Sequence, residues 1–319
     1  MAEPDRTSGE AWERKTLEKV ALAAIAEQRR TRHWSIFFKL LLFVYLFTLL
    51  FLWLGWIGKK DATSSGKHTA LVELQGVIGP ESAASADNVI AGLQSAFKDK
   101  GTQGVILRIN SPGGSPVQAG HINDEIKRLR AKYPNILLYA VVEDICASGG
   151  YYVAVAADQI YVDKGSIIGS IGVLMDGFGF TGLMDKLGIE RRLLAAGENK
   201  GFLDPFSPIR DDQQKYAATM LDAIHQQFIT VVREGRGKRL KETPELFSGL
   251  LWVGTRSVEL GLADALGSVD FVAREVIKAE EIIDFTPREN IAERVARRFG
   301  AAMAETLVRT ATGSTSAIR

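Results

Sequence analysis

Apolar and polar residues follow three patterns along the chain. Residues 40–58, LLLFVYLFTLLFLWLGWIG, carry no charge and are apolar on every face of a helix. At a rise of ~1.5 Å per residue, this run is long enough to cross a hydrocarbon core of roughly 30 Å. From residue 69 onward, short runs rich in β-branched residues alternate with amphipathic segments. Beyond residue 210, a long helix is predicted because apolar residues recur at every fourth position: Tyr216, Met220, Ile224, Phe228 and Val232.

The alternation after residue 69 predicts a mostly parallel sheet. Strands are expected at residues 69–78, 104–110, 135–142, 159–163 and 170–175. Helices are expected at residues 85–99 and 117–133, and another begins near Ser148. Repeated strand–helix–strand units pack helices against the faces of a sheet, so the predicted fold class is α/β.

The same patterns divide the chain into five segments. They are a tail of mixed charge (1–33), a transmembrane helix (34–58), a polar linker (59–68), the α/β domain (69–285) and an amphipathic tail (286–319). The first tail is either a surface helix or a mobile segment. The last tail carries apolar residues four apart: Ile291, Val295, Phe299, Met303 and Leu307. It either lies against a partner chain or the membrane surface, or it caps the domain.

The apolar run is interpreted as a membrane anchor with a cytoplasmic N-terminus. A cleaved signal peptide is disfavoured, because the run exceeds the usual apolar region of about 7–15 residues and no A-x-A cleavage site follows. A buried core helix is disfavoured because no face of the run is polar. Four basic residues precede the run and three follow it, which is a small bias towards a cytoplasmic N-terminus. The domain is then expected on the outer side of the membrane.

Composition excludes several classes of function. The formal net charge is +1, so nucleic acid is not indicated as a partner. Cys146 is the single cysteine, so neither an intrachain disulfide nor a cysteine metal cluster can form. Four histidines are scattered without an HExxH spacing, so no metal site is expected.

Ser148 in EDICASGGYYVA is a candidate nucleophile at the junction of a strand and a helix. The alternative is an ordinary N-cap, in which the hydroxyl accepts a bond from a free helix N–H. Gly149 permits close approach of another backbone. Gly114 in INSPGGSP follows a different strand, and strand-end loops of a parallel sheet share one edge. The amides of Gly114 and Gly149 are therefore expected to converge on one oxyanion.

A base for this serine is harder to identify. His121 and His225 lie within predicted helices, so a Ser-His-Asp triad is not indicated. A lysine serves only when its amine is neutral, and burial lowers a lysine pKa by up to ~3–5 units. Lys200 in AAGENKGFLDPFSP is expected to follow a strand and to be enclosed by the apolar residues of its loop. The alternative is a solvated loop lysine.

Four ordered motifs carry a family resemblance: LRINSPGGSP, ASGGYYVA, GSIIGSIGV and AGENKGFLDPFSP. Together they resemble the short, single-domain form of peptidase family S49, the signal peptide peptidase A family. The resemblance covers residues 69–278 and the membrane span. It implies a Clp protease/crotonase-like fold, Ser148 as nucleophile and Lys200 as its general base. It also implies an oxyanion hole at Gly114 and Gly149, and Ser170 as the residue that orients the lysine amine.

The resemblance further implies a membrane-anchored serine endopeptidase that degrades cleaved signal peptides and similar apolar peptides. No metal or organic cofactor is expected. A homo-oligomer is expected in which neighbouring subunits share the Ser-Lys dyad. Two other hypotheses remain open, namely a crotonase-type acyl-CoA enzyme and a non-catalytic scaffold that oligomerises at the membrane.

Overall fold

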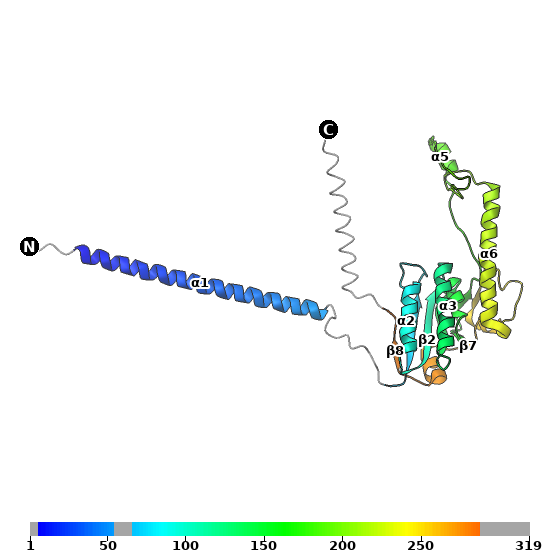
Figure 1. Cartoon of the computed structure of the whole chain (residues 1–319), viewed down its shortest axis with the longest axis horizontal. Coiled ribbons are helices and arrows are strands. Elements are labelled where there is room, and N and C mark those ends of the chain that lie inside the picture. The colour runs from blue at the N-terminus through cyan, green and yellow to red at the C-terminus, as the bar shows by residue number, and fades with distance from the viewer. Residues whose placement is uncertain (1–5, 54–65, 288–319) are drawn as a thin grey trace, which may run out of the picture. The chain divides into compact units, whose positions relative to one another are not determined.

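The computed structural model describes residues 6–53 and 66–287, and the chain divides into two units (Figure 1). The first unit contains one long helix, α1 (Arg6–Trp53). Within α1, the stretch Glu27–Phe51 is long and apolar enough to cross a membrane. This stretch begins before the predicted transmembrane helix of residues 34–58, whose last five residues lie outside the described part. The amphipathic tail beyond residue 287 also lies outside it.

The second unit, Ser64–Arg288, is built on a sheet of eight strands. Its centre consists of three parallel strands, β1 (His68–Gln75), β2 (Thr102–Ser111) and β3 (Leu137–Ala147). Shorter strands complete it: β4 (Gln159–Val162), β5 (Ile167–Gly169), β6 (Leu251–Val253), β7 (Ala265–Leu266) and β8 (Ile282–Asp284). The main order is β6-β5-β3-β2-β1-β8, β4 pairs with β3 and β7, and the β5–β6 pair is antiparallel. The α/β class predicted from the alternating pattern is confirmed.

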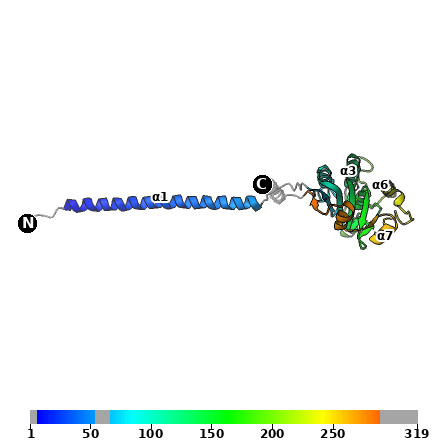
Figure 2. The same ribbon diagram turned by 90° about the horizontal axis from the view of Figure 1, so that it is seen from below.

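Alternate residues of the central strands face two different cores, as the two-residue period of a strand requires. Val105, Leu107 and Ile109 of β2 belong to the larger core. That core lies between the sheet and helices α2 (Ala86–Lys98), α3 (Pro116–Lys132), α4 (Gly149–Ala154) and α6 (Asp211–Arg236) (Figures 1 and 2). Ile106 faces the smaller core, where it packs with residues of the π-helical segment η2 (Val272–Ile277). The remaining short helices are η1 (Gly237–Arg239), α7 (Gly254–Glu259) and α8 (Val269–Phe271).

The strand predicted at residues 170–175 is wrong, because the strand in this region is β5 and it ends at Gly169. Gly169, the last residue of β5, has a φ of 118°, and the φ of 51° at Ser170 is incompatible with an extended strand. The Ser170 N–H donates to the carbonyl of Leu250 (2.8 Å) as the chain leaves the sheet. The pairing of β5 with β3 therefore ends at Gly169, opposite Ala147, the last residue of β3.

Helix α6 continues beyond the sheet and supports an arm, defined here as residues 173–210. The arm contains α5 (Thr181–Leu187), which lies at the end of α6 remote from the sheet (Figure 1). The backbone of Leu203 donates to Gln213 Oε1 (3.2 Å), and the Phe202 ring contacts the Tyr216 ring edge-on (5.8 Å). The predicted apolar stripe of α6 is thus buried only towards its C-terminus, at Phe228 and Val232, whereas Tyr216 is 62% exposed.

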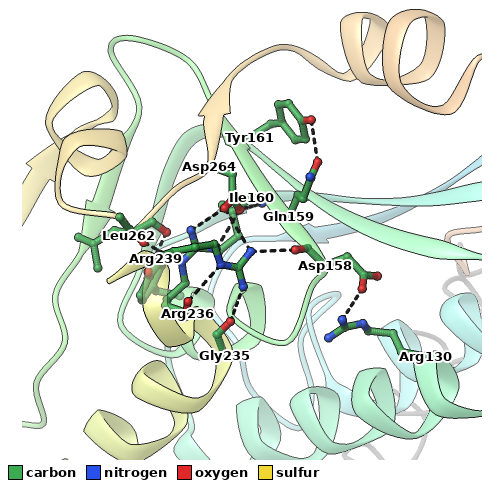
Figure 3. A network of polar contacts seen from close by, with 12 residues as sticks. Arg130, Asp158, Gln159, Ile160, Tyr161, Gly235, Arg236, Arg239, Leu262 and Asp264 are labelled. Atoms are coloured by element: carbon green, nitrogen blue, oxygen red, sulfur yellow. Dashed lines mark hydrogen bonds and ion pairs between the residues drawn. The ribbon is translucent and has the colours of Figure 1, made fainter. Parts of the chain in front are cut away.

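A buried ion pair attaches the other end of α6 to the sheet (Figure 3). The Arg236 side chain is 1% exposed and donates two bonds to the Asp264 carboxylate, each 2.9 Å long. It also donates to the carbonyl of Gly261 (2.8 Å), and the carboxylate accepts the N–H of Ile160 in β4 (2.7 Å). Arg239 reaches the same carboxylate (3.1 Å) from a more exposed position. The network therefore fixes where α6 leaves the core.

Candidate active site

Ser148 occupies a strained turn between β3 and α4. Its backbone angles are φ 50° and ψ −122°, and its side chain makes no capping bond to the helix. The N-cap hypothesis is therefore wrong. A non-glycine residue in such a conformation costs about 1–3 kcal/mol and persists only where its surroundings enforce it. Here the Ser148 N–H donates to the Gly169 carbonyl (2.9 Å) and its carbonyl accepts the N–H of Tyr152 (3.0 Å).

Glycines allow the loop after β2 to approach this turn closely. A Cβ at Gly113, whose φ is 101°, would lie 2.7 Å from the Cβ of Ser148. A Cβ at Gly114, whose φ is 145°, would lie 2.1 Å from the carbonyl oxygen of Ile78. At Gly149, the Cβ position lies 3.3 Å from the amide nitrogen of Gly114. The backbones of Gly114 and Gly149 are thus neighbours beside Ser148, as the strand-end argument predicts.

A cleft of about 480 Å³ opens at this junction. Four of the five site residues predicted from sequence line it: Ser148, Gly149, Gly114 and Ser170. The rest of the wall is largely apolar and includes Tyr152 of α4 and Phe228 of α6. A serine hydroxyl, two backbone amides and an apolar wall are among the parts that acyl transfer requires, and a base for the serine is the part still to be found.

Lys200, the fifth predicted residue, does not line this cleft. It lies exposed on the arm, where its N–H donates to the Gly197 carbonyl (3.1 Å). The neighbouring Phe202 contacts Tyr216 of α6. The first residue of α6 that lines the cleft is Ile224. Eight residues of helix separate these two positions, which is about 12 Å along the axis. Within one chain, therefore, the Lys200 amine is not enclosed as predicted. The strand predicted before Lys200 is also wrong, because residues 188–199 contain no strand.

Comparison with known proteins identifies the family. The model of peptidase family S49 matches residues 130–282, a stretch that includes Ser148, Ser170 and Lys200. A putative protease of Methanocaldococcus jannaschii is 32% identical over 216 residues, which cover 66% of this chain and 68% of that protein. The chain belongs to peptidase family S49. Its mostly parallel sheet, covered by helices, is consistent with the Clp-like fold that the resemblance to this family implies.

Other relatives of this S49 chain differ in length. A putative signal peptide peptidase SppA of Enterococcus faecium is 29% identical over 199 residues, which cover 62% of this chain and 57% of that protein. A Brucella melitensis protein named Na⁺/H⁺ antiporter NhaA is 47% identical over 178 residues. This match covers 56% of the chain but 24% of the Brucella protein. The chain thus spans only part of the length of these relatives.

Two side chains near the S49 cleft have structural roles. The ring of His225, on α6, bonds through Nε2 to the carbonyl of Ile171 (3.0 Å), beside Ser170, so it supports the cleft wall. Cys146 is fully buried at the end of β3, and burial raises the pKa of its thiol. That thiol stays protonated at neutral pH, as expected of a small core residue.

Proposed function

We propose that this chain is a membrane-anchored serine endopeptidase with Ser148 as its nucleophile and Lys200 as its general base. The main support is the turn at Ser148, where a strained serine with no helix-capping bond lines one cleft with Gly114 and Gly149. Backbone strain of this kind is concentrated at active sites. A similar strained strand-to-helix turn exposes the nucleophile of α/β-hydrolases.

The proposed reaction is acyl transfer through a covalent intermediate. Ser148 Oγ attacks the peptide carbonyl carbon while its proton passes to the neutral amine of Lys200. The negative oxygen accepts bonds from the N–H groups of Gly114 and Gly149, each worth about 3–4 kcal/mol of transition-state stabilisation. Lys200 then gives the proton to the leaving amine as the C–N bond breaks, and Ser170 orients the lysine amine. Water hydrolyses the acyl-enzyme and frees Ser148.

The dyad is proposed to form between neighbouring copies of the chain. Lys200 is exposed on the arm of its own chain and does not line the cleft that contains Ser148. Large apolar side chains of the arm are also exposed, including Phe178 (77%) and Leu194 (96%). A second copy packed against this face would bury them, and it would remove the lysine amine from water.

The proposed substrates are apolar peptides, such as signal peptides left in the membrane after cleavage. The apolar stretch of α1 and the apolar cleft wall support this choice. The charge bias around the span supports a cytoplasmic N-terminus with the peptidase unit on the outer side of a bacterial cell membrane.

A fluorophosphonate probe tests this function directly. The full-length chain in detergent is expected to react at Ser148, as located by mass spectrometry of the labelled peptide. Ser148→Ala should not be labelled, and Lys200→Ala should be labelled more slowly because the hydroxyl loses its base. Labelling at another serine, or equal labelling of Ser148→Ala, would contradict the proposal, and absence of labelling would favour a scaffold.

A further inference from the structure

Tyr152 lies in the first turn of α4, close to the proposed nucleophile. Its N–H donates to the carbonyl of Ser148 (3.0 Å), one helical turn away. Tyr152 and Ser148 both line the cleft of about 480 Å³, so Tyr152 is part of the cleft wall that the proposed nucleophile shares.

Tyr152 also lines a second hollow, of about 400 Å³. Tyr152 and Gln227 line both hollows, and the second is completed by residues of α6 such as Thr230 and Glu234. It is shallow and open along α6. The two hollows are thus neighbours that meet at Tyr152 and Gln227.

The Tyr152 ring is held in position from several directions. It packs against the Phe228 ring with centroids 5.2 Å apart. The backbone carbonyl of Tyr152 accepts a bond from Asn123 Nδ2 (2.7 Å). Burial raises the pKa of Tyr152, and the nearby charges of Asp124 and Glu234 raise it further. Tyr152 thus lines both hollows, and its ring contacts Phe228, which lines the Ser148 cleft.

We propose that Tyr152 determines how large a substrate side chain fits beside Ser148. This inference rests on the peptidase function proposed above. The residue whose carbonyl is attacked has its side chain nearest Ser148, so it meets the Tyr152 ring. Small and medium aliphatic side chains fit in front of the ring. Aromatic side chains need the space that the ring and the second hollow occupy.

The test uses peptides that differ only in this residue, alanine or phenylalanine, each carrying the same fluorogenic amine as leaving group. The full-length chain in detergent is assayed, and the ratio of kcat/KM for the phenylalanine peptide to that for the alanine peptide is compared between variants. Tyr152→Ala is expected to raise the ratio at least about tenfold, because pocket contacts change discrimination by roughly 10–200-fold. Tyr152→Phe keeps the ring and is expected to keep the wild-type ratio.

Gln227→Ala provides a second route to the same result. Gln227 is exposed on α6 and borders both hollows, so its truncation widens the boundary without disturbing α4. Gln227→Ala is also expected to raise the ratio of the two kcat/KM values, by a smaller factor than Tyr152→Ala. If circular dichroism shows that Tyr152→Ala is unfolded, Gln227→Ala becomes the test of the inference. An unchanged ratio in every folded variant, with cleavage that still requires Ser148, would overturn this inference alone. Wild-type cleavage that Ser148→Ala does not reduce would overturn the peptidase function, and this inference with it.

Discussion

Ser148→Ala is expected to lower kcat for peptide cleavage by about 10⁴-fold or more while the chain remains folded. The substitution removes the atom that forms the acyl-enzyme, so only binding and the amides of Gly114 and Gly149 remain. Lys200→Ala is expected to have an effect of similar size, because the hydroxyl then has no acceptor for its proton. The double variant should be no slower than either single one, since a nucleophile and its base act as a unit.

The measurement is kcat on an apolar fluorogenic peptide, with the full-length chain in detergent. Ser95→Ala and Lys98→Ala are matched controls, because both residues are exposed on α2 and do not line the cleft. Both controls should cleave at the wild-type rate. A Ser148→Ala chain that retains a rate within about tenfold of wild type would exclude a covalent route through this residue.

Asp264→Asn is expected to reduce the free energy of unfolding of the peptidase unit by about 3 kcal/mol. The substitution leaves the guanidinium of Arg236, only 1% exposed, without a counter-charge in the core. Arg239→Gln is the matched control, because it removes the other, 41% exposed arginine from the same carboxylate. It should cost less than about 1 kcal/mol. Urea denaturation followed by tryptophan fluorescence measures both, and equal costs would contradict a special role for the buried pair.

The same pair predicts a dependence of stability on pH. Burial acts to raise the pKa of Asp264, but the hydrogen bonds and charge of Arg236 outweigh it and hold that pKa below its ordinary value. The carboxylate therefore contributes stability above the ordinary pKa of about 4, and this contribution is lost as the pH falls through the lower folded value. The loss should be smaller in Asp264→Asn than in the wild type over that acidic range.

The central fold could be predicted from local sequence patterns. β-branched runs and four-residue apolar spacing are properties of single segments, so they indicate β1 to β4, α2, α3 and α6. Strand 170–175 was wrongly predicted because its apolar residues suit a strand, whereas Gly169 and Ser170 turn the chain out of the sheet. Whether the chain continues as a strand or turns here depends on the positive φ angles of Gly169 and Ser170. These angles depend on contacts with β6, which lies far away in the sequence.

The part of the site that lies at one edge of the sheet could be predicted from the sequence. Gly114, Gly149 and Ser170 meet Ser148 because each follows the end of a parallel or neighbouring strand. Lys200 belongs to the arm, whose environment depends on contacts that no segment of sequence encodes by itself. Tyr152 was missed although the signal was present, namely an aromatic residue four positions after the nucleophile in a helix.

Mixing the two inactive variants tests the shared dyad most directly. Ser148→Ala and Lys200→Ala chains, carrying different tags, are co-assembled in equal amounts, and co-purification through both tags verifies the mixed assembly. If each site takes Ser148 from one copy and Lys200 from its neighbour, half of the serines and half of the lysines are intact, so about a quarter of wild-type activity should return. A verified mixed assembly that cleaves no faster than either variant alone would contradict a dyad formed between chains.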